Sequence, residues 1–251
     1  MDADEGLGRL RALGFPEADA SLLWEHFDDA ERRGKASHGH ARIAWLETLE
    51  FDPRAEPELV EESDAFERWH ARGAIGYVVV ARAVSRVLAS PPERVRVVVC
   101  EQTYPTGALG HHVRRLADAG LVGLLTATSP ARLASPDGGP PVTGTNPLAI
   151  GIPSSGGGPV VADVSMGAVT WGDVVAGRAS EDDLVPFGGE QSYKAFALAV
   201  GLQLLVDALV SEPGHGAVLV AARPESDPVP ALRARSAGVR LPGDRASPKP
   251  T

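Results

Sequence analysis

The segment from Val95 to Thr126 constrains the fold most, because two apolar strands in it flank one amphipathic helix. Residues 95–100 and 121–126 are β-branched or apolar almost throughout, which is typical of buried strands. Residues 109–119 between them repeat apolar side chains at helical spacing. This strand–helix–strand spacing predicts an α/β protein.

The rest of the chain supplies further helices and strands. Gly14-Phe15-Pro16 separates two helical runs, and Gly156-Gly157-Gly158 predicts a turn between two strands. The helix expected over 192–210 is apolar on nearly every side, which predicts that it lies inside the fold. The other expected helices cover 7–13, 20–33, 43–46, 75–88 and 168–176, and the other strands cover 148–152, 160–164 and 217–221.

These elements suggest three parts. Residues 1–72 form a helical N-terminal part, and residues 73–244 form an α/β core. The last segment, 245–251, has two prolines and few apolar residues, so we expect it to be disordered.

Composition excludes several classes of function. The 251-residue chain carries a net charge of −9, which argues against nucleic acid or an anionic membrane as its main partner. One cysteine, Cys100, excludes an internal disulfide framework. The acidic start of the chain does not resemble a signal peptide. The apolar run 195–209 is short and contains Gln203 and Asp207, so we expect no membrane span and a cytoplasmic location.

Familiar cofactor and metal motifs are missing from the sequence. It contains neither G-x-G-x-x-G after a strand nor G-x-x-x-x-G-K-[ST], which argues against a Rossmann site and a P-loop. The pairs His38/His40 and His111/His112 have no third ligand nearby in sequence. We therefore expect no bound metal.

The loop Ser37-His38-Gly39-His40-Ala41-Arg42 allows two interpretations. A histidine beside glycine at a helix end is sterically open, and an arginine four residues later could hold a carboxylate while the imidazole moves a proton. Alternatively, Ser37 caps the next helix and the basic residues are solvated. These residues alone leave both interpretations open.

Other candidate segments are ordinary turn sequences when taken one at a time. Residues 102–107 follow the strand 95–100, where α/β sheets commonly carry binding groups, and within them Tyr104 is a candidate for substrate contact. Gly144-Thr145-Asn146-Pro147 precedes a strand, and Asp163 ends another. Their order along the chain is more specific than any one of them.

In that order the sequence resembles the type-2 malate/L-lactate dehydrogenase family, which includes ureidoglycolate, sulfolactate and diketogulonate dehydrogenases and cyclic-imine reductases. Residues 33–43 are similar to the family's R-G-x-x-S-H-G-x-x-R-[LI], and residues 144–153 to its G-T-N-P-[LI]-A-[IF]-x-[IV]-P. The other matching segments are 73–80, 107–111, 186–189 and 240–245.

The resemblance implies a non-Rossmann α/β fold with N-terminal helices and a mixed central sheet, a homodimer, and reduction of a small 2-oxo acid or cyclic 2-imino acid by NADH or NADPH. His38 would be the acid/base, supported by Ser37 and Asp163 at the active-site wall. The substrate carboxylate would bind Arg42, with Tyr104 nearby. The residues implied to contact the cofactor are Thr145, Asn146, Ser165 and Gly189.

The sequence also departs from the family, mostly on the cofactor side. Tyr104-Pro105-Thr106 stands where the family has a second active-site histidine, and Gln191 replaces a lysine. Glu190 adds a negative charge near the expected cofactor, and a long segment is replaced by 175–185. An alternative hypothesis is therefore a cofactor-independent cyclisation, elimination or isomerisation that uses His38 and Arg42. The Ala-, Arg-, Gly-, Pro- and Val-rich composition suggests a GC-rich bacterial genome. Together with the divergence from the family, this suggests a specialised biosynthetic pathway.

Overall fold

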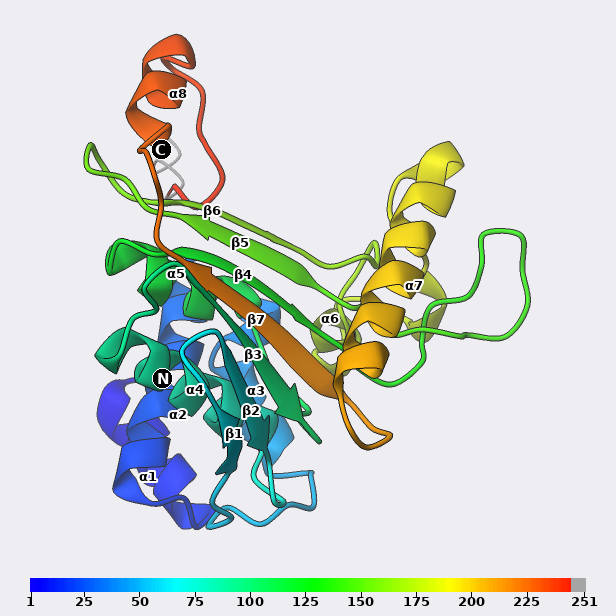
Figure 1. Cartoon of the computed structure of the whole chain (residues 1–251). Coiled ribbons are helices and arrows are strands. Elements are labelled where there is room, and N and C mark those ends of the chain that lie inside the picture. The colour runs from blue at the N-terminus through cyan, green and yellow to red at the C-terminus, as the bar shows by residue number, and fades with distance from the viewer. Residues whose placement is uncertain (245–251) are drawn as a thin grey trace.

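A mixed seven-stranded sheet forms the centre of the computed structural model, which describes residues 1–244 (Figure 1). The strands lie in the order β1-β2-β3-β7-β4-β5-β6, and only β2 and β3 are parallel neighbours. Their bounds are β1 Glu58–Glu62, β2 Phe66–His70, β3 Val95–Glu101, β4 Val122–Ala127, β5 Leu148–Ile152, β6 Val160–Val164 and β7 Gly216–Ala222. The mixed sheet and N-terminal helices agree with the predicted α/β fold class.

Helices α1, α2, α4 and α5 lie on one side of the sheet, whereas α7 stands apart beside the ends of β4 and β7 (Figure 1). The α-helices are α1 Ala3–Ala12, α2 Glu17–Arg32, α3 Ala41–Leu46, α4 Gly76–Ala89, α5 Leu109–Asp118, α6 Trp171–Val175, α7 Ser192–Leu209 and α8 Val229–Arg235. Short 3₁₀ helices are η1 Ala36–His38, η2 Glu181–Asp183 and η3 Gly189–Gln191.

The largest apolar core lies between the sheet and helices α4 and α5. Fully buried side chains in it include Val84, Leu116, Leu125 and Leu219. A second core joins α1, α2 and α3 to the start of α4. The loop that carries His38 lies between α2 and α3, so this second core fixes the loop's position against the sheet.

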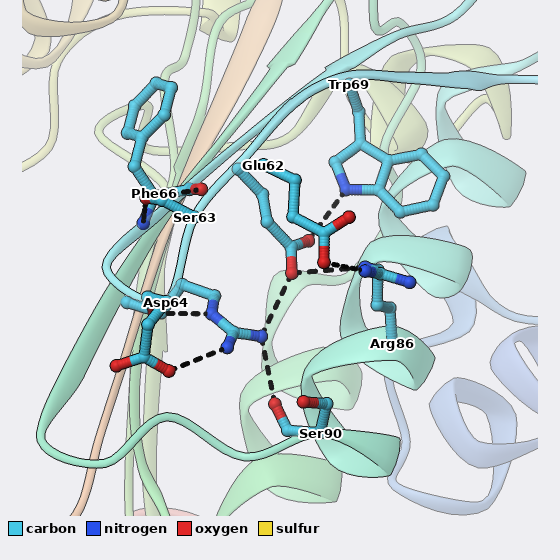
Figure 2. A network of polar contacts seen from close by, with 9 residues as sticks. Glu62, Ser63, Asp64, Phe66, Trp69, Arg86 and Ser90 are labelled. Carbon is cyan, nitrogen blue, oxygen red and sulfur yellow. Dashed lines mark hydrogen bonds and ion pairs between the residues drawn. The ribbon is translucent and has the colours of Figure 1, made fainter.

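An ionic network ties β2 to β3 and α4 (Figure 2). Glu67 is fully buried and accepts hydrogen bonds from Arg96 at 3.0 Å and from the Trp69 indole at 3.0 Å. Arg96 also donates to the carbonyls of Asp64 and Ser90 at 2.8 and 2.9 Å. Each buried charge in this network therefore has several partners, as burial requires.

Periodicity predicted most of the elements. The helices expected over 7–13, 20–33, 43–46, 75–88 and 109–119 and all five expected strands are present, with shifted ends. The β1–β2 hairpin and α8 were not predicted, and α6 is shorter than the helix expected over 168–176. The tail 245–251, expected to be disordered, lies outside the described residues.

The expectation that the helix over 192–210 lies inside the fold was wrong. Only Ala195, Ala199 and Val206 of α7 are buried, and Leu198, Leu204 and Leu205 are among its exposed side chains. Residues 189–209, with a mean hydropathy of 1.3, are also long and apolar enough by composition to span a membrane, which the run 195–209 did not predict. Hydrophobicity on all sides of the helix did not show that the other residues of 1–244 leave most of α7 at least partly exposed.

Candidate active site

A cavity of about 290 Å³ lies where the η1–α3 loop meets the ends of several strands. Residues 35–45 form one wall, and residues 104–108, after β3, form another. The remaining walls come from 127–132, after β4, from 145–147 and 163–165, at the ends of β5 and β6, and from 170–172, at the start of α6. Segments far apart in sequence thus converge on one small volume.

His38 lies in the cavity wall at the end of η1. Its Nδ1 is 3.0 Å from the hydroxyl of the neighbouring Ser37. Burial, and after it the positive charge of Arg42, lowers the pKa of His38 to about 4, whereas Asp163 opposes this shift. The imidazole is therefore neutral at pH 7 and can accept a proton.

Arg42 is held rigidly at the start of α3. Its Nε donates to the carbonyl of Ser37 at 2.8 Å, and its guanidinium carbon lies 4.6 Å from the centre of the Trp45 ring. Gly172 is required here, because a Cβ at this position would lie 2.3 Å from the backbone oxygen of Ser37 and 2.5 Å from Nη2 of Arg42. Stacking and one hydrogen bond orient the guanidinium while leaving other N–H groups for a ligand.

Asp163, at the end of β6, forms an ion pair with Lys35 in the same cavity. The approach of Asp163 to α5 depends on Gly110, where a Cβ would lie 2.7 Å from the carboxylate oxygen Oδ2. The glycine at position 110, which matches the family segment 107–111, is therefore explained by its close packing against Asp163. Lys35 was not predicted as a site residue, although it lies only two residues before Ser37.

Arg132 is a second arginine in the cavity wall that the sequence did not predict. It lies in the irregular segment between β4 and β5, with its guanidinium carbon 3.5 Å from the centre of the Trp171 ring. Three cations, Lys35, Arg42 and Arg132, line the cavity beside one carboxylate, Asp163. The cavity is thus positively charged in a chain whose net charge is −9.

Seven of the nine predicted site residues lie together in this cavity wall, namely Ser37, His38, Arg42, Tyr104, Thr145, Asp163 and Ser165. Asn146 and Gly189 are not among its lining residues. Asn146 is fully buried, and its Nδ2 donates to Thr143, to the Ala199 carbonyl and to Gln203 of α7. Asn146 therefore anchors α7. Gly189 is exposed, as is the neighbouring Glu190, which is absent from the cavity wall.

A cluster of three histidines lies behind the cavity wall. His26, His111 and His112 place ligand-type atoms within 4.8 Å of one another. However, the Nε2 lone pair of His26 accepts a hydrogen bond from the backbone N–H of Ala108 at 3.0 Å. A neutral His26 then carries its proton on Nδ1 and has no free lone pair for an ion. Burial keeps the pKa values of His26 and His112 well below the ordinary value.

Comparison with known proteins identifies the family of the chain. The model of the malate/L-lactate dehydrogenase family matches residues 7–184, which include η1, α5 and β6. The chain belongs to this family. It is 31% identical over 173 residues to a (2R)-3-sulfolactate dehydrogenase (NADP⁺) of Chromohalobacter salexigens, a match that covers 67% of this chain and 52% of the relative.

A second relative is the Δ¹-pyrroline-2-carboxylate/Δ¹-piperideine-2-carboxylate reductase of Pseudomonas syringae pv. tomato, 33% identical over 177 residues, or 67% of this chain and 50% of the relative. The chain thus matches about half the length of these curated relatives. A solved Δ¹-piperideine-2-carboxylate reductase from the same organism superimposes with a TM-score of 0.82 at 24% identity, covering 96% of this chain and 89% of the other. That likeness confirms the fold.

Proposed function

We propose that this family member is an oxidoreductase that uses NADH or NADPH to reduce a small 2-oxo acid or cyclic 2-imino acid. The observation that carries the proposal is the convergence of His38, Arg42 and Asp163 on one cavity. A histidine and an arginine are the groups that proton transfer to a carbonyl or imine and binding of its adjacent carboxylate require. We extend the proposal to a cytoplasmic, specialised biosynthetic role.

In this mechanism Arg42 binds the substrate carboxylate, and His38 gives a proton to the carbonyl oxygen or imine nitrogen. The cofactor supplies the hydride when it is bound. Because the charge of Arg42 lowers the pKa of His38, a carboxylate against Arg42 offsets that charge and raises the pKa again. Substrate binding therefore favours the protonated imidazole. In the reverse direction, neutral His38 accepts the proton of the hydroxy acid.

The cavity fits the nicotinamide end of such a cofactor. Thr145 and Ser165 line it with hydroxyl groups, and the Thr145 hydroxyl has no hydrogen-bond partner among residues 1–244. Hydroxyls of this kind bind amide and ribose groups. The volume of about 290 Å³ is near the lower limit for ligand pockets, so it suits a small acid and one ring, and a whole dinucleotide would extend beyond it.

Replacement of His38 tests the proposal. We expect His38→Ala to lower kcat for reduction of 2-oxo acids by about 10²- to 10⁴-fold, because the proton donor is lost. His40→Ala is the matched control, since His40 stacks on Trp24 outside the cavity wall. Equal activity of His38→Ala and His40→Ala under steady-state assay would remove His38 from the mechanism.

We also propose that the chain is a homodimer that covers α7. The support is the exposed apolar surface of this helix, where Tyr193, Leu198 and Leu204 are more than half exposed. We expect Leu204→Glu to convert a dimer to a monomer in sedimentation velocity. Val239→Glu changes an equally exposed apolar residue outside α7 and should leave the dimer intact. A monomeric wild-type chain would contradict this part of the proposal.

A further inference from the structure

Two arginines in the cavity wall have no acidic partner among residues 1–244. The carboxylates nearest to this region are already engaged, because Asp163 pairs with Lys35, and Asp173 pairs with Arg178 at 3.1 Å and caps α6. Arg42 and Arg132 contact tryptophan rings and form no ion pair within these residues. Two positive charges in one small cavity therefore lack protein counter-charges.

Both guanidinium groups contact the same dipeptide at the start of α6. Arg132 stacks on the ring of Trp171, and Arg42 approaches the backbone at Gly172 so closely that a Cβ there would clash. A guanidinium stacked on an aromatic ring keeps its N–H donors at its edge, where they can bind a planar anion with two hydrogen bonds. Each arginine thus has one face against a tryptophan ring, and both line the same cavity.

We propose that Arg132 and Trp171 form a second anion subsite beside Arg42, which binds the distal acidic group of a dianionic substrate. The substrate class is then a 2-oxo or 2-imino acid with a second carboxylate or sulfonate, in place of a monoanionic acid. This inference rests on the proposed function for the role of Arg42. It assigns a specificity-determining role to Arg132.

The uncompensated positive charge in the cavity favours a dianionic substrate over a monoanionic one. A monoanionic acid at Arg42 would leave Arg132 uncompensated in a partly desolvated cavity, which costs free energy, whereas a dianion compensates both arginines. Lys35 does not need a charge from the substrate, because Asp163 already balances its positive charge. The remaining competitor for Arg132 is a cofactor phosphate, and the experiment below separates the two.

The test compares malate and lactate, which share the 2-hydroxy acid group and differ by the second carboxylate. Each is titrated calorimetrically into the whole chain, alone and with NADP⁺ or NAD⁺ present. We expect the wild-type protein to bind malate at least about tenfold more tightly than lactate, as a charge-assisted bidentate contact predicts. Arg132→Gln should remove this preference and leave lactate binding unchanged.

Arg94→Gln is the matched control, because it makes the same charge change at an exposed arginine paired with Glu225 outside the cavity. It should retain the malate preference. Equal binding of malate and lactate by the wild-type protein, or no binding of malate at millimolar concentration, would overturn the subsite. So would an Arg132→Gln variant that loses affinity for NADPH but not for malate.

The same titrations separate this inference from the proposed function. Malate preference that depends on Arg132, without binding of NADH or NADPH, would support the subsite and contradict the reductase. Cofactor binding and turnover without malate preference would support the reductase and contradict the subsite. Thermal melting of Arg132→Gln beside the wild-type chain shows whether the variant is folded.

Discussion

Arginines occur in two contrasting surroundings in this molecule. In the network of Figure 2, Arg96 contacts the carboxylates of Glu67 and Asp64 and two backbone carbonyls. In the cavity, Arg42 has one carbonyl and a tryptophan ring, and Arg132 has a tryptophan ring. Donors that are satisfied within the protein hold the fold together, whereas donors left open in a cavity are available to an anionic ligand.

Removing the central carboxylate of the network should have the largest effect on stability. Glu67→Ala leaves Arg96 buried without its main counter-charge, and we expect a loss of about 3–5 kcal/mol in the free energy of unfolding. Urea denaturation of the wild-type and variant proteins measures this change in the free energy of unfolding. Glu225→Ala, which breaks an exposed pair, is the control and should change stability little. Similar urea midpoints for Glu67→Ala and Glu225→Ala would show that the network does not stabilise the fold.

Acid should destabilise the protein through histidines near the cavity. His26 and His112 have pKa values well below 6.5 when folded, and that of His38 is about 4, so the unfolded chain binds protons that the folded chain does not. Stability is therefore unaffected by these groups above pH 6.5 and falls as the pH decreases below it. Each histidine contributes about 1.4 kcal/mol per pH unit between its two pKa values.

The variant His112→Leu sharpens this prediction, because it removes one of the buried titrating groups. Its free energy of unfolding, measured by urea titration between pH 6.5 and pH 5, should depend on pH less steeply than that of the wild-type chain. The difference in slope should correspond to about one proton fewer bound on unfolding. An identical slope would show that His112 does not bind an additional proton on unfolding.

The cavity arginine should have the smallest effect on the fold and a clear effect on binding. Arg42→Lys keeps the charge but loses the bidentate geometry, so we expect about tenfold weaker binding of a carboxylate substrate. The melting temperature should change little, because no ion pair is lost within residues 1–244. An unchanged KM would contradict the assignment of Arg42 as the carboxylate anchor.

The sequence predicted the fold where side-chain periodicity reports burial. Strands β3 and β4 and helix α5 followed from apolar spacing alone. The β1–β2 hairpin did not, because β1 is mostly charged and exposed and so lacks the alternation of a half-buried strand. The exposure of α7 could not be predicted either, since composition does not show what covers a helix.

The site was predictable where a motif fixes local geometry. The spacing of His38 and Arg42 in one loop and helix left two interpretations open, and the family resemblance assigned both residues to one site. Arg132 lies in an irregular segment whose path depends on tertiary contacts, such as the bridge between Leu133 and Thr143. Asn146 matched the family motif, yet its side chain holds α7. A motif match identifies a segment, and only the structure separates its ligand-facing residues from its packing residues.

We propose that this positively charged cavity receives a nicotinamide cofactor together with a small acid. Calorimetric titration of NADH and NADPH, each into the whole purified chain, tests it most directly. We expect saturable binding of one or both cofactors, and weaker binding when Thr145, whose hydroxyl lies in the cavity wall, is replaced by valine. If neither cofactor bound at millimolar concentration, the reductase function would be contradicted and proton-transfer chemistry at His38 without a hydride would be favoured.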